Sequence, residues 1–340
     1  MKHVNIAIFI PHLGCPNQCV FCNQRSISGV TEFDVSNVEE TIEAALVTIP
    51  DDFIVEIAFF GGSFTGIDRD LMIELLQIAY AYVKAGRVSH IRCSTRPDYI
   101  NPEILEILKQ YGVKVIELGL QSTSEGVLAA TKRGHTLSDE INACKLIVEY
   151  GFDLVGQMMI GLPGSTLEDE INTARFIIGS GAVGARIYPT VVFKETELCS
   201  LTENGEYIPL SLDDAVNRSA KILKLFLSSG VKVIRIGLCS SENLSSEDTY
   251  FAGPNHAAIG ELVENRIYYD VINEKIKDID FDEKSVLKIY VARGCLSKAI
   301  GQRKKNKFLL AKILGTDNIS FLESDDLDLY EVLVIVERKR

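Results

Sequence analysis

Short apolar runs alternate along the first part of the chain with longer segments in which apolar residues recur every three or four positions. The short runs are rich in β-branched and aromatic residues and predict strands, whereas the longer segments predict amphipathic helices. Asn101 before Pro102 is typical of a helix start, and the spacing of Ser165 and Glu168 predicts a capping box. The predicted strands span residues 4–10, 53–60, 88–95, 113–122, 152–161 and 185–192. The predicted helices span residues 36–48, 68–85, 101–110, 138–150 and 166–180.

This alternation predicts an α/β fold with a parallel sheet built from βαβ units. In a parallel barrel or an open sheet, ligands bind at the carboxyl ends of the strands. Three segments rich in Gly, Ser, Thr and Pro follow predicted strands: GGSFTG (61–66), CSTRPD (93–98) and GLPGST (161–166). We therefore expect these segments to face one site, together with the cysteine-rich loop after the first strand.

The βα rhythm fades after about residue 195. A helix near 213–228, a strand at 231–237 and helical sequence at 255–279 are predicted there. The tail has strand patterns at 286–291, 318–324 and 330–337, with a helix–loop–helix pattern at 292–314. We expect three domains: residues 1–240, 241–283 and 284–340.

The composition excludes several classes of protein. Hydrophobic residues make up 46% and charged residues 24% of the 340 residues, as in globular chains and unlike disordered ones. No apolar run approaches the ~18 residues that a membrane span needs, and the first residues read as a strand rather than a signal peptide. Eight cysteines, three of them clustered, are too few for a disulfide scaffold. We therefore expect the protein in the reducing cytoplasm.

The clustered cysteines are Cys15, Cys19 and Cys22, spaced C-x3-C-x2-C. Thiolates this close can converge on one metal centre. His12 could complete a zinc site with three cysteines and one histidine. The alternative is a [4Fe–4S] cluster with three protein thiolates and one open iron, which could bind a substrate or cofactor.

The cysteine spacing, with an aromatic residue at position 21, resembles the radical S-adenosylmethionine (radical SAM) superfamily. Further motifs follow in order: GGSF (61–64), CSTRPD (93–98), ELGLQS (117–122), RGH (133–135) and DLVGQMMIGLPGST (153–166). Together they look closest to the radical SAM core of the Elongator catalytic subunit and related bacterial proteins. The resemblance covers roughly residues 5–195 and implies a partial (βα)6 barrel of the TIM-like kind.

The resemblance also implies the chemistry. Cys15, Cys19 and Cys22 would hold a [4Fe–4S] cluster whose open iron chelates S-adenosylmethionine (SAM). An electron from the cluster, supplied by a reductant such as flavodoxin or ferredoxin, would cleave the sulfonium to a 5′-deoxyadenosyl radical that abstracts hydrogen from a substrate.

The same resemblance implies a set of SAM-contacting residues. The glycine motif would bind the SAM amino group through backbone carbonyls, the segment after the third strand would lie near the ribose or carboxylate, Arg133 could pair with the carboxylate, and the segment after Met158 would frame adenine. The implied cofactor-binding residues are Phe21, Gly61, Gly62, Ser63, Phe64, Ser94, Thr95, Arg96, Gln121, Ser122, Arg133, Met159, Ile160, Gly161, Leu162 and Pro163.

Two departures from related families limit what is carried over. Oxygen-independent coproporphyrinogen oxidase has a further cysteine two places after its last ligand, where this chain has Gln24. The Elongator subunit carries an acetyltransferase domain, which we do not expect here. Neither a haem-pathway role nor carboxymethyl transfer therefore follows from the resemblance.

The tail is basic within an acidic chain. Nine basic residues and no acidic residue lie between Lys284 and Thr316, whereas the whole chain has a net charge of −12. Two helices joined by a glycine turn and followed by a strand resemble a KH domain, whose G-x-x-G loop clamps a nucleic-acid backbone. The second glycine is missing here, so the KH module is degenerate. The expected RNA contacts are Arg303, Lys304 and Lys305.

The sequence thus predicts a radical SAM enzyme that acts on RNA, with transfer RNA and ribosomal RNA as the candidates. One alternative is a radical SAM enzyme for a protein or small metabolite. The other is a non-catalytic RNA-binding iron–sulfur sensor, which the intact glycine motif disfavours because a sensor needs no SAM site.

Overall fold

The structure is a computed structural model that describes residues 3–10, 13–15, 19–23, 33–238, 248–277, 279 and 285–338. The chain divides into two compact units. The first comprises residues Met1–Ser211 and Leu225–Asn255, and the second comprises Leu212–Lys224 and His256–Arg340. The predicted domain boundaries at residues 240 and 283 lie outside the described residues.

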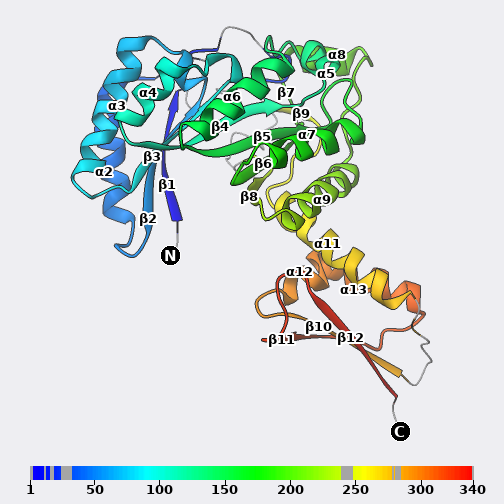
Figure 1. Cartoon of the computed structure of the whole chain (residues 1–340). Coiled ribbons are helices and arrows are strands. Elements are labelled where there is room, and N and C mark those ends of the chain that lie inside the picture. The colour runs from blue at the N-terminus through cyan, green and yellow to red at the C-terminus, as the bar shows by residue number, and fades with distance from the viewer. Residues whose placement is uncertain are drawn as a thin grey trace. The chain divides into compact units, whose positions relative to one another are not determined.

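The first unit is built on a parallel sheet of seven strands, in the order β1-β2-β3-β4-β5-β6-β8, which curls into a half-barrel (Figure 1). The six predicted strands are confirmed, and the predicted strand at 231–237 forms the seventh, β8, at the edge. The predicted partial barrel is therefore confirmed. Its strands are β1 (His3–Ile10), β2 (Ile54–Gly61), β3 (His90–Thr95), β4 (Val113–Gln121), β5 (Asp153–Ile160), β6 (Gly184–Pro189) and β8 (Lys232–Ile236).

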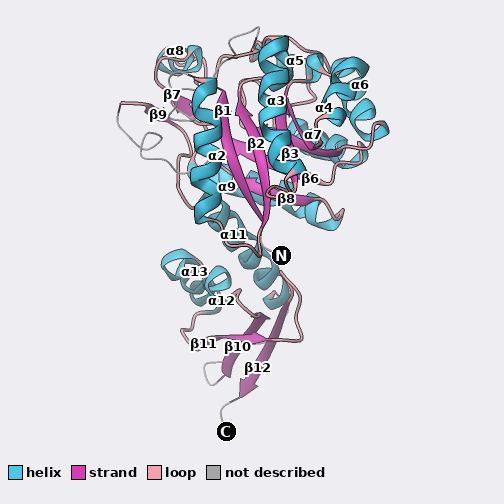
Figure 2. Cartoon of the chain, turned by 90° about the vertical axis from the view of Figure 1, so that its left-hand side faces the viewer, coloured by secondary structure: helices cyan, strands magenta, loops and turns pink. Residues whose placement is uncertain are grey.

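Helices cover the convex side of this sheet; Figure 2 shows α2 and α3 lying across β1 and β2. They do so through apolar stripes: α3 buries Met72, Leu75, Leu76 and Ala79, which share one helix face. The helices of this unit are α2 (Val38–Thr48), α3 (Arg69–Lys84), α4 (Pro102–Gln110), α5 (Glu125–Ala130), α6 (Leu137–Glu149), α7 (Leu167–Gly179) and α8 (Glu197–Glu203). A further helix, α9 (Leu212–Ser228), has residues in both units. A short antiparallel pair, β7 (Val192–Phe193) with β9 (Tyr250–Ala252), completes the unit.

Of the two predicted helix starts, one is confirmed and the other lies one residue from its predicted position. Asn101 caps α4 as expected, since its side chain accepts a hydrogen bond from Ile104 N. The capping box predicted at Ser165 is wrong by one residue. Thr166 and Asp169 form it instead, because both the threonine hydroxyl and the aspartate carboxylate are engaged there.

The strands expose their two faces to different surroundings. In β1, Ile6, Ile8 and Ile10 are buried, while alternate residues such as Asn5 and Phe9 are only partly covered. Because side chains alternate across a strand, the second set lies on the concave face. The carboxyl ends of β1 to β6 meet along one edge of this face, where the predicted site residues lie.

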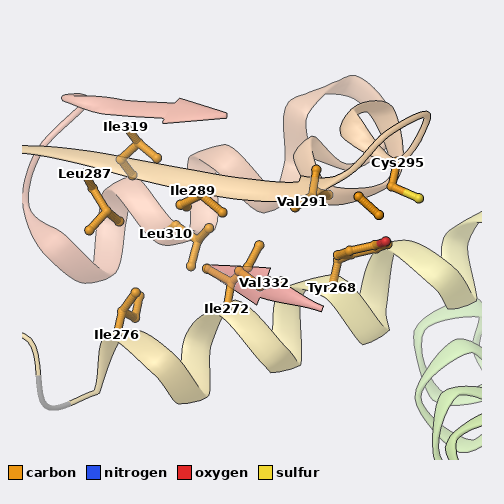
Figure 3. Close-up of a cluster of buried hydrophobic side chains, with 12 residues drawn as sticks. Tyr268, Ile272, Ile276, Leu287, Ile289, Val291, Cys295, Leu310, Ile319 and Val332 are labelled. Atoms are coloured by element: carbon orange, nitrogen blue, oxygen red, sulfur yellow. The ribbon is translucent and has the colours of Figure 1, made fainter. Parts of the chain in front are cut away.

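The second unit contains a three-stranded sheet in the order β11-β10-β12, in which β10 runs parallel to β11 and antiparallel to β12. The predicted tail strands and helix–loop–helix are confirmed. Its elements are α11 (Ile259–Ile276), β10 (Ser285–Ala292), α12 (Leu296–Ile300), α13 (Lys305–Leu314), β11 (Ile319–Ser324) and β12 (Val332–Arg338). Figure 3 shows its core, in which α11 presents Tyr268, Ile272 and Ile276 to the strands.

None of the helices described here is long and apolar enough to cross a membrane.

Candidate functional site

The cysteine-rich loop follows β1 and lies against the turn that follows β2. Ser63 N donates a hydrogen bond to Leu13 O at 3.2 Å, and Gly62 N donates to Ile10 O at 2.8 Å. A Cβ atom at position 62 would lie 2.1 Å from Leu13 O, so this close approach requires glycine. Gly61, with a φ of +106°, adopts a backbone conformation that other residues rarely reach.

The three cysteines of the loop differ in burial: Cys15 is exposed, Cys22 is half-buried and Cys19 is buried. Arg133 Nη1 donates a hydrogen bond to Cys19 Sγ at 3.3 Å. Although Cys15 as a whole residue is exposed, its thiol lies among protein groups. This desolvation raises its pKa and the neighbouring Cys19 raises it further, while the positive charges of Arg96 and Arg133 oppose the shift. Cationic groups of this kind favour the thiolate form that binds metals.

The ends of β2 and β3 are joined by a cluster of buried hydroxyl groups. Thr95 Oγ1 lies 3.1 Å from Ser63 Oγ and 2.5 Å from Thr65 Oγ1. Arg96 N donates to Ser63 Oγ at 3.1 Å. Ser63 and Thr95 are therefore brought together as expected. Thr65, which the sequence analysis missed, belongs to the same cluster.

Two arginines connect the strand ends to the cysteine loop. Arg96 forms an ion pair with Asp98 at 2.9 Å and donates through Nη2 to Arg133 O at 2.6 Å. Arg133 in turn donates through Nη2 to Gly119 O at 2.6 Å, besides contacting Cys19. The guanidinium of Arg133 thus bridges the end of β4 and one of the clustered cysteines.

Gln121 ends β4 in a left-handed conformation with a φ of 71°. Its side chain is buried, and its Oε1 makes no hydrogen bond among the described residues. Strain and an unsatisfied buried acceptor at one residue are typical of a functional position. Ser122 has a local role, since its Oγ accepts a hydrogen bond from Ser124 N. Ser94 is half-buried on the concave face of β3.

The segment after β5 is held through both backbone polar groups of Gly161. Gly161 N donates to Glu170 Oε1 at 2.8 Å, and Tyr207 Oη donates to Gly161 O at 2.6 Å. The sequence analysis missed Glu170 and Tyr207, because neither lies in the motif that they hold. Among the other predicted residues of this segment, Ile160 and Leu162 are buried, whereas Met159 and Pro163 are partly exposed.

The two predicted aromatic contacts lie in apolar surroundings. Phe64 is buried and stacks on Phe59, with ring centroids 4.4 Å apart. Phe21 packs against a cluster formed by Val20, Val192, Leu198, Cys199 and Tyr207. Backbone hydrogen bonds from Val20 N to Thr131 O and from Leu198 N to Val20 O anchor this part of the loop.

The residues present fit the expected cofactors. The three thiols supply the donors of an iron–sulfur cluster. Gly62 lets the cysteine loop lie directly against the turn after β2, and the free Oε1 of Gln121 offers a buried acceptor to a polar ligand. His12 and Gln24, on which the zinc alternative and one family comparison rest, lie outside the described residues.

Below this edge, the concave face carries a chain of buried charges that the sequence analysis did not identify. Arg92 donates to Glu56 Oε2 at 2.5 Å and to Glu117 Oε1 at 2.6 Å. Arg186 donates to the same Glu117 Oε1 at 2.9 Å. Each of these residues stands alone within an apolar strand, so only the sheet topology brings them together.

His135 of the RGH motif is also buried, in a pair with Glu140 whose Nε2–Oε1 distance is 3.0 Å. Burial lowers the pKa of His135 to about 3 and raises the pKa of Glu140 to about 9. Both side chains are therefore uncharged at neutral pH, and the pair supports the loop that carries Arg133.

The predicted RNA contacts belong to the second unit. Arg303 and Lys304 are exposed in the turn between α12 and α13, with φ values of 52° and 62°. Lys305, the first residue of α13, forms an exposed ion pair with Asp213 at 3.1 Å.

Comparisons with known proteins agree with this site. The model of the radical SAM superfamily matches residues 9–177, and that of the radical SAM C-terminal domain matches residues 182–269. Human Elongator complex protein 3 is 33% identical over 191 residues, covering 50% of this chain and 35% of that protein. The tRNA uridine(34) acetyltransferase of Methanocaldococcus jannaschii is 32% identical over 182 residues, covering 48% of this chain and 34% of that protein. The chain spans about a third of the length of these relatives.

Among solved structures, the archaeal Elp3 of Methanocaldococcus infernus, with residues 1–46 deleted, has a similar fold. The TM-score is 0.62 at 21% sequence identity, over 81% of this chain and 63% of that one.

Proposed function

The chain belongs to the radical SAM superfamily, and we propose that this member acts on RNA, with transfer RNA as the class of substrate to test first. Enzymes of this superfamily use a [4Fe–4S] cluster and SAM, so the protein is a radical SAM enzyme with these cofactors. The proposal includes a reductant such as flavodoxin or ferredoxin and a location in the cytoplasm.

The cluster would be held by Cys15, Cys19 and Cys22. When bound, the cluster supplies the electron for reductive cleavage of SAM, which yields the species that removes hydrogen from the substrate. The hydrogen bond from Arg133 to Cys19 Sγ supports this assignment, because donors to ligating sulfurs stabilise their negative charge.

The protein's own groups would bind and orient SAM. We assign its amino group to the carbonyls of Gly61 and Gly62, and its carboxylate to Arg133. The hydrogen bonds to Gly161 from Tyr207 and from Gly161 to Glu170 support a role of its segment beside the adenine, since they fix the path of the backbone there. Gln121 Oε1 is a further buried acceptor for a polar group of the ligand.

The observation that carries the RNA assignment is the exposed basic turn between α12 and α13. Arg303 and Lys304 form no ion pair within the described part of the chain, and no side chain caps the N-terminus of α13. Exposed cationic side chains at the start of a helix suit a phosphate. A KH-like module would clamp a nucleic-acid backbone with this turn.

The relatives add a second line of support. One is named as a tRNA uridine(34) acetyltransferase, and its match covers the radical SAM part of this chain. A radical SAM core shared with such a protein favours RNA over the alternatives of a protein or a small metabolite.

The direct test compares modified nucleosides in RNA from cells with and without the gene. We expect at least one modified nucleoside to disappear from the transfer RNA fraction. In the matching assay, reconstituted enzyme with dithionite and SAM should release 5′-deoxyadenosine faster when the unmodified RNA is added. An unchanged nucleoside profile, with RNA-independent SAM cleavage, would favour a protein or metabolite substrate. Cluster-loaded protein that binds no SAM would favour the sensor.

A further inference from the structure

Three side chains that can bind metals converge at the amino-terminal ends of the first three strands. His3 lies on β1, Glu56 on β2 and His90 on β3, and Glu56 is the direct sheet partner of His90. Their ligand atoms all lie within 4.8 Å of one another. No other group of three histidine, cysteine or carboxylate ligands is gathered so closely in the ranges that the structure describes.

Both imidazoles face the same carboxylate oxygen. His3 Nε2 lies 2.7 Å from Glu56 Oε1, and His90 Nε2 contacts the same atom. The other oxygen, Oε2, accepts a hydrogen bond from Arg92 Nε at 2.5 Å. Arg92 thus turns Oε1 toward the two histidines, as outer hydrogen-bond donors do for metal-binding carboxylates.

The carboxylate is enclosed by the protein: the side chain of Glu56 is 1% exposed, and both of its oxygens face groups of the neighbouring strands. Arg92 is shared with Glu117, with Nη1 at 2.6 Å from Oε1, so its charge does not cancel that of Glu56 alone. A carboxylate oxygen beside two imidazole nitrogens is a donor set that divalent cations bind.

We propose that His3, Glu56 and His90 bind a zinc-class divalent cation, with water in a fourth coordination position. Two histidines and one glutamate are a ligand set that zinc uses when one position stays open. The side chains of His3 and His90 are 38% and 19% exposed, so the ion and its water can reach the site from solvent.

This site is separate from the cysteine loop and does not rest on the proposed function. It lies at the opposite end of β1, whose eight residues span roughly 25 Å at about 3.3 Å per residue. A bound ion would cross-link the ends of β1, β2 and β3, and so fix the strand that leads into the cysteine loop.

Zinc binding by the cluster-loaded, full-length protein tests the proposal, because a loaded cluster occupies the cysteines. Equilibrium dialysis against Zn²⁺, followed by metal analysis, should give one zinc per chain in addition to the iron. In His3→Gln and His90→Gln, the amide still donates a hydrogen bond to Glu56 but is a poor ligand for zinc, so binding should weaken by at least about tenfold. Zinc should also raise the melting temperature of the wild type and not that of the variants.

His256→Gln is the matched control, since His256 lies in the second unit, and it should bind zinc like the wild type. If the wild type takes up no zinc, or both test variants bind it as tightly, the three residues form a hydrogen-bonded network only and the proposal is wrong. Uptake that persists in both test variants and disappears in Cys19→Ala would place the zinc at the cysteine loop, which also overturns it.

Discussion

The surroundings of individual cysteine residues predict which of them bind the cluster. Burial raises the pKa of both Cys93 and Cys144 to about 12, so these side chains stay protonated in the core. Cys19 lies in the cysteine loop between Cys15 and Cys22, and its sulfur accepts a hydrogen bond from the guanidinium of Arg133.

Replacing Cys19 by Ala should therefore abolish the cluster, whereas Cys144→Ala should leave it intact. Iron and sulfide analysis after anaerobic reconstitution measures this, with about four of each expected per loaded chain. Equal iron in both variants, or a stoichiometric zinc that persists through reconstitution, would contradict the assignment.

The buried pair of His135 and Glu140 predicts a dependence of stability on pH. The pKa of Glu140 is about 9 in the folded protein, against ~4.3 for an unperturbed glutamate. Between these values the folded state holds a proton that the unfolded state releases. The contribution of Glu140 to stability is complete below the lower value and is lost as the pH rises toward the higher one.

Glu140→Gln should remove this dependence, since an amide does not titrate. Between pH 7 and pH 9 the wild type should lose up to about 1.4 kcal/mol of unfolding free energy per pH unit from this group, and the variant should lose less. Urea unfolding at both pH values measures the difference. Parallel losses in the two proteins would mean that Glu140 is ionised in the fold.

At the scale of elements, the turn between α12 and α13 predicts a stabilising substitution. Lys304 adopts a φ of 62°, which costs a side-chain-bearing residue roughly 1 kcal/mol and costs glycine little. Lys304→Gly should therefore raise the free energy of unfolding by roughly 0.5 kcal/mol, and it would restore the glycine that a KH loop has at this position.

The matched control is Lys307→Gly, which removes the same charge inside α13 and should destabilise the protein by about 1 kcal/mol. Urea unfolding followed by the helical signal compares the two. A loss of stability in Lys304→Gly equal to that of the control would show that the turn gains nothing from glycine.

The elements themselves followed from the sequence because each rests on local pattern. Runs of β-branched residues predicted the strands, and Asn101 before Pro102 predicted the start of α4. The capping box of α7 was predicted one residue too early. Ser165 and Glu168 have the same spacing as Thr166 and Asp169, so spacing alone does not distinguish the two pairs.

Contacts between distant elements could not be predicted in this way. Glu56, Arg92, Glu117 and Arg186 meet only because their strands are neighbours or share the concave face. Tyr207 reaches Gly161 across 46 residues of sequence. The motifs of the site were predictable, whereas the residues that hold them in position required the fold.

At the scale of the whole molecule, charge is distributed unevenly. The nine basic residues between Lys284 and Thr316 leave a net charge of −21 on the rest of the chain, given the total of −12. Several of the nine are engaged in the structure, as in the ion pairs of Lys288 with Glu337 and of Lys298 with Glu264. Arg303, Lys304, Lys307 and Lys312 form no ion pair among the described residues, so the remaining positive charge is concentrated on the turn and on α13.

RNA binding through this charge should be strongly dependent on salt, because each phosphate that pairs with a basic residue releases counterions. For single strands the slope of log affinity against log salt is roughly −0.7 per phosphate contacted. Replacing Arg303, Lys304 and Lys305 together by Ala should weaken binding across RNA sequences and reduce the slope by about two units. Filter binding over a range of salt concentrations measures this.

A triple variant of Lys114, Lys145 and Arg175, exposed residues of the first unit, removes the same charge and is the matched control. It should keep the wild-type slope, because a loss of net charge alone removes no phosphate contact. SAM binding should be unchanged in both variants, since the residues assigned to SAM all precede residue 164. If the turn variant binds RNA as tightly as the wild type at low salt, the basic turn is a solvated surface. If the slope of log affinity against log salt decreases equally in both variants, the protein attracts RNA by its overall charge. The hypothesis of a KH-like clamp is then wrong, even if RNA is the substrate.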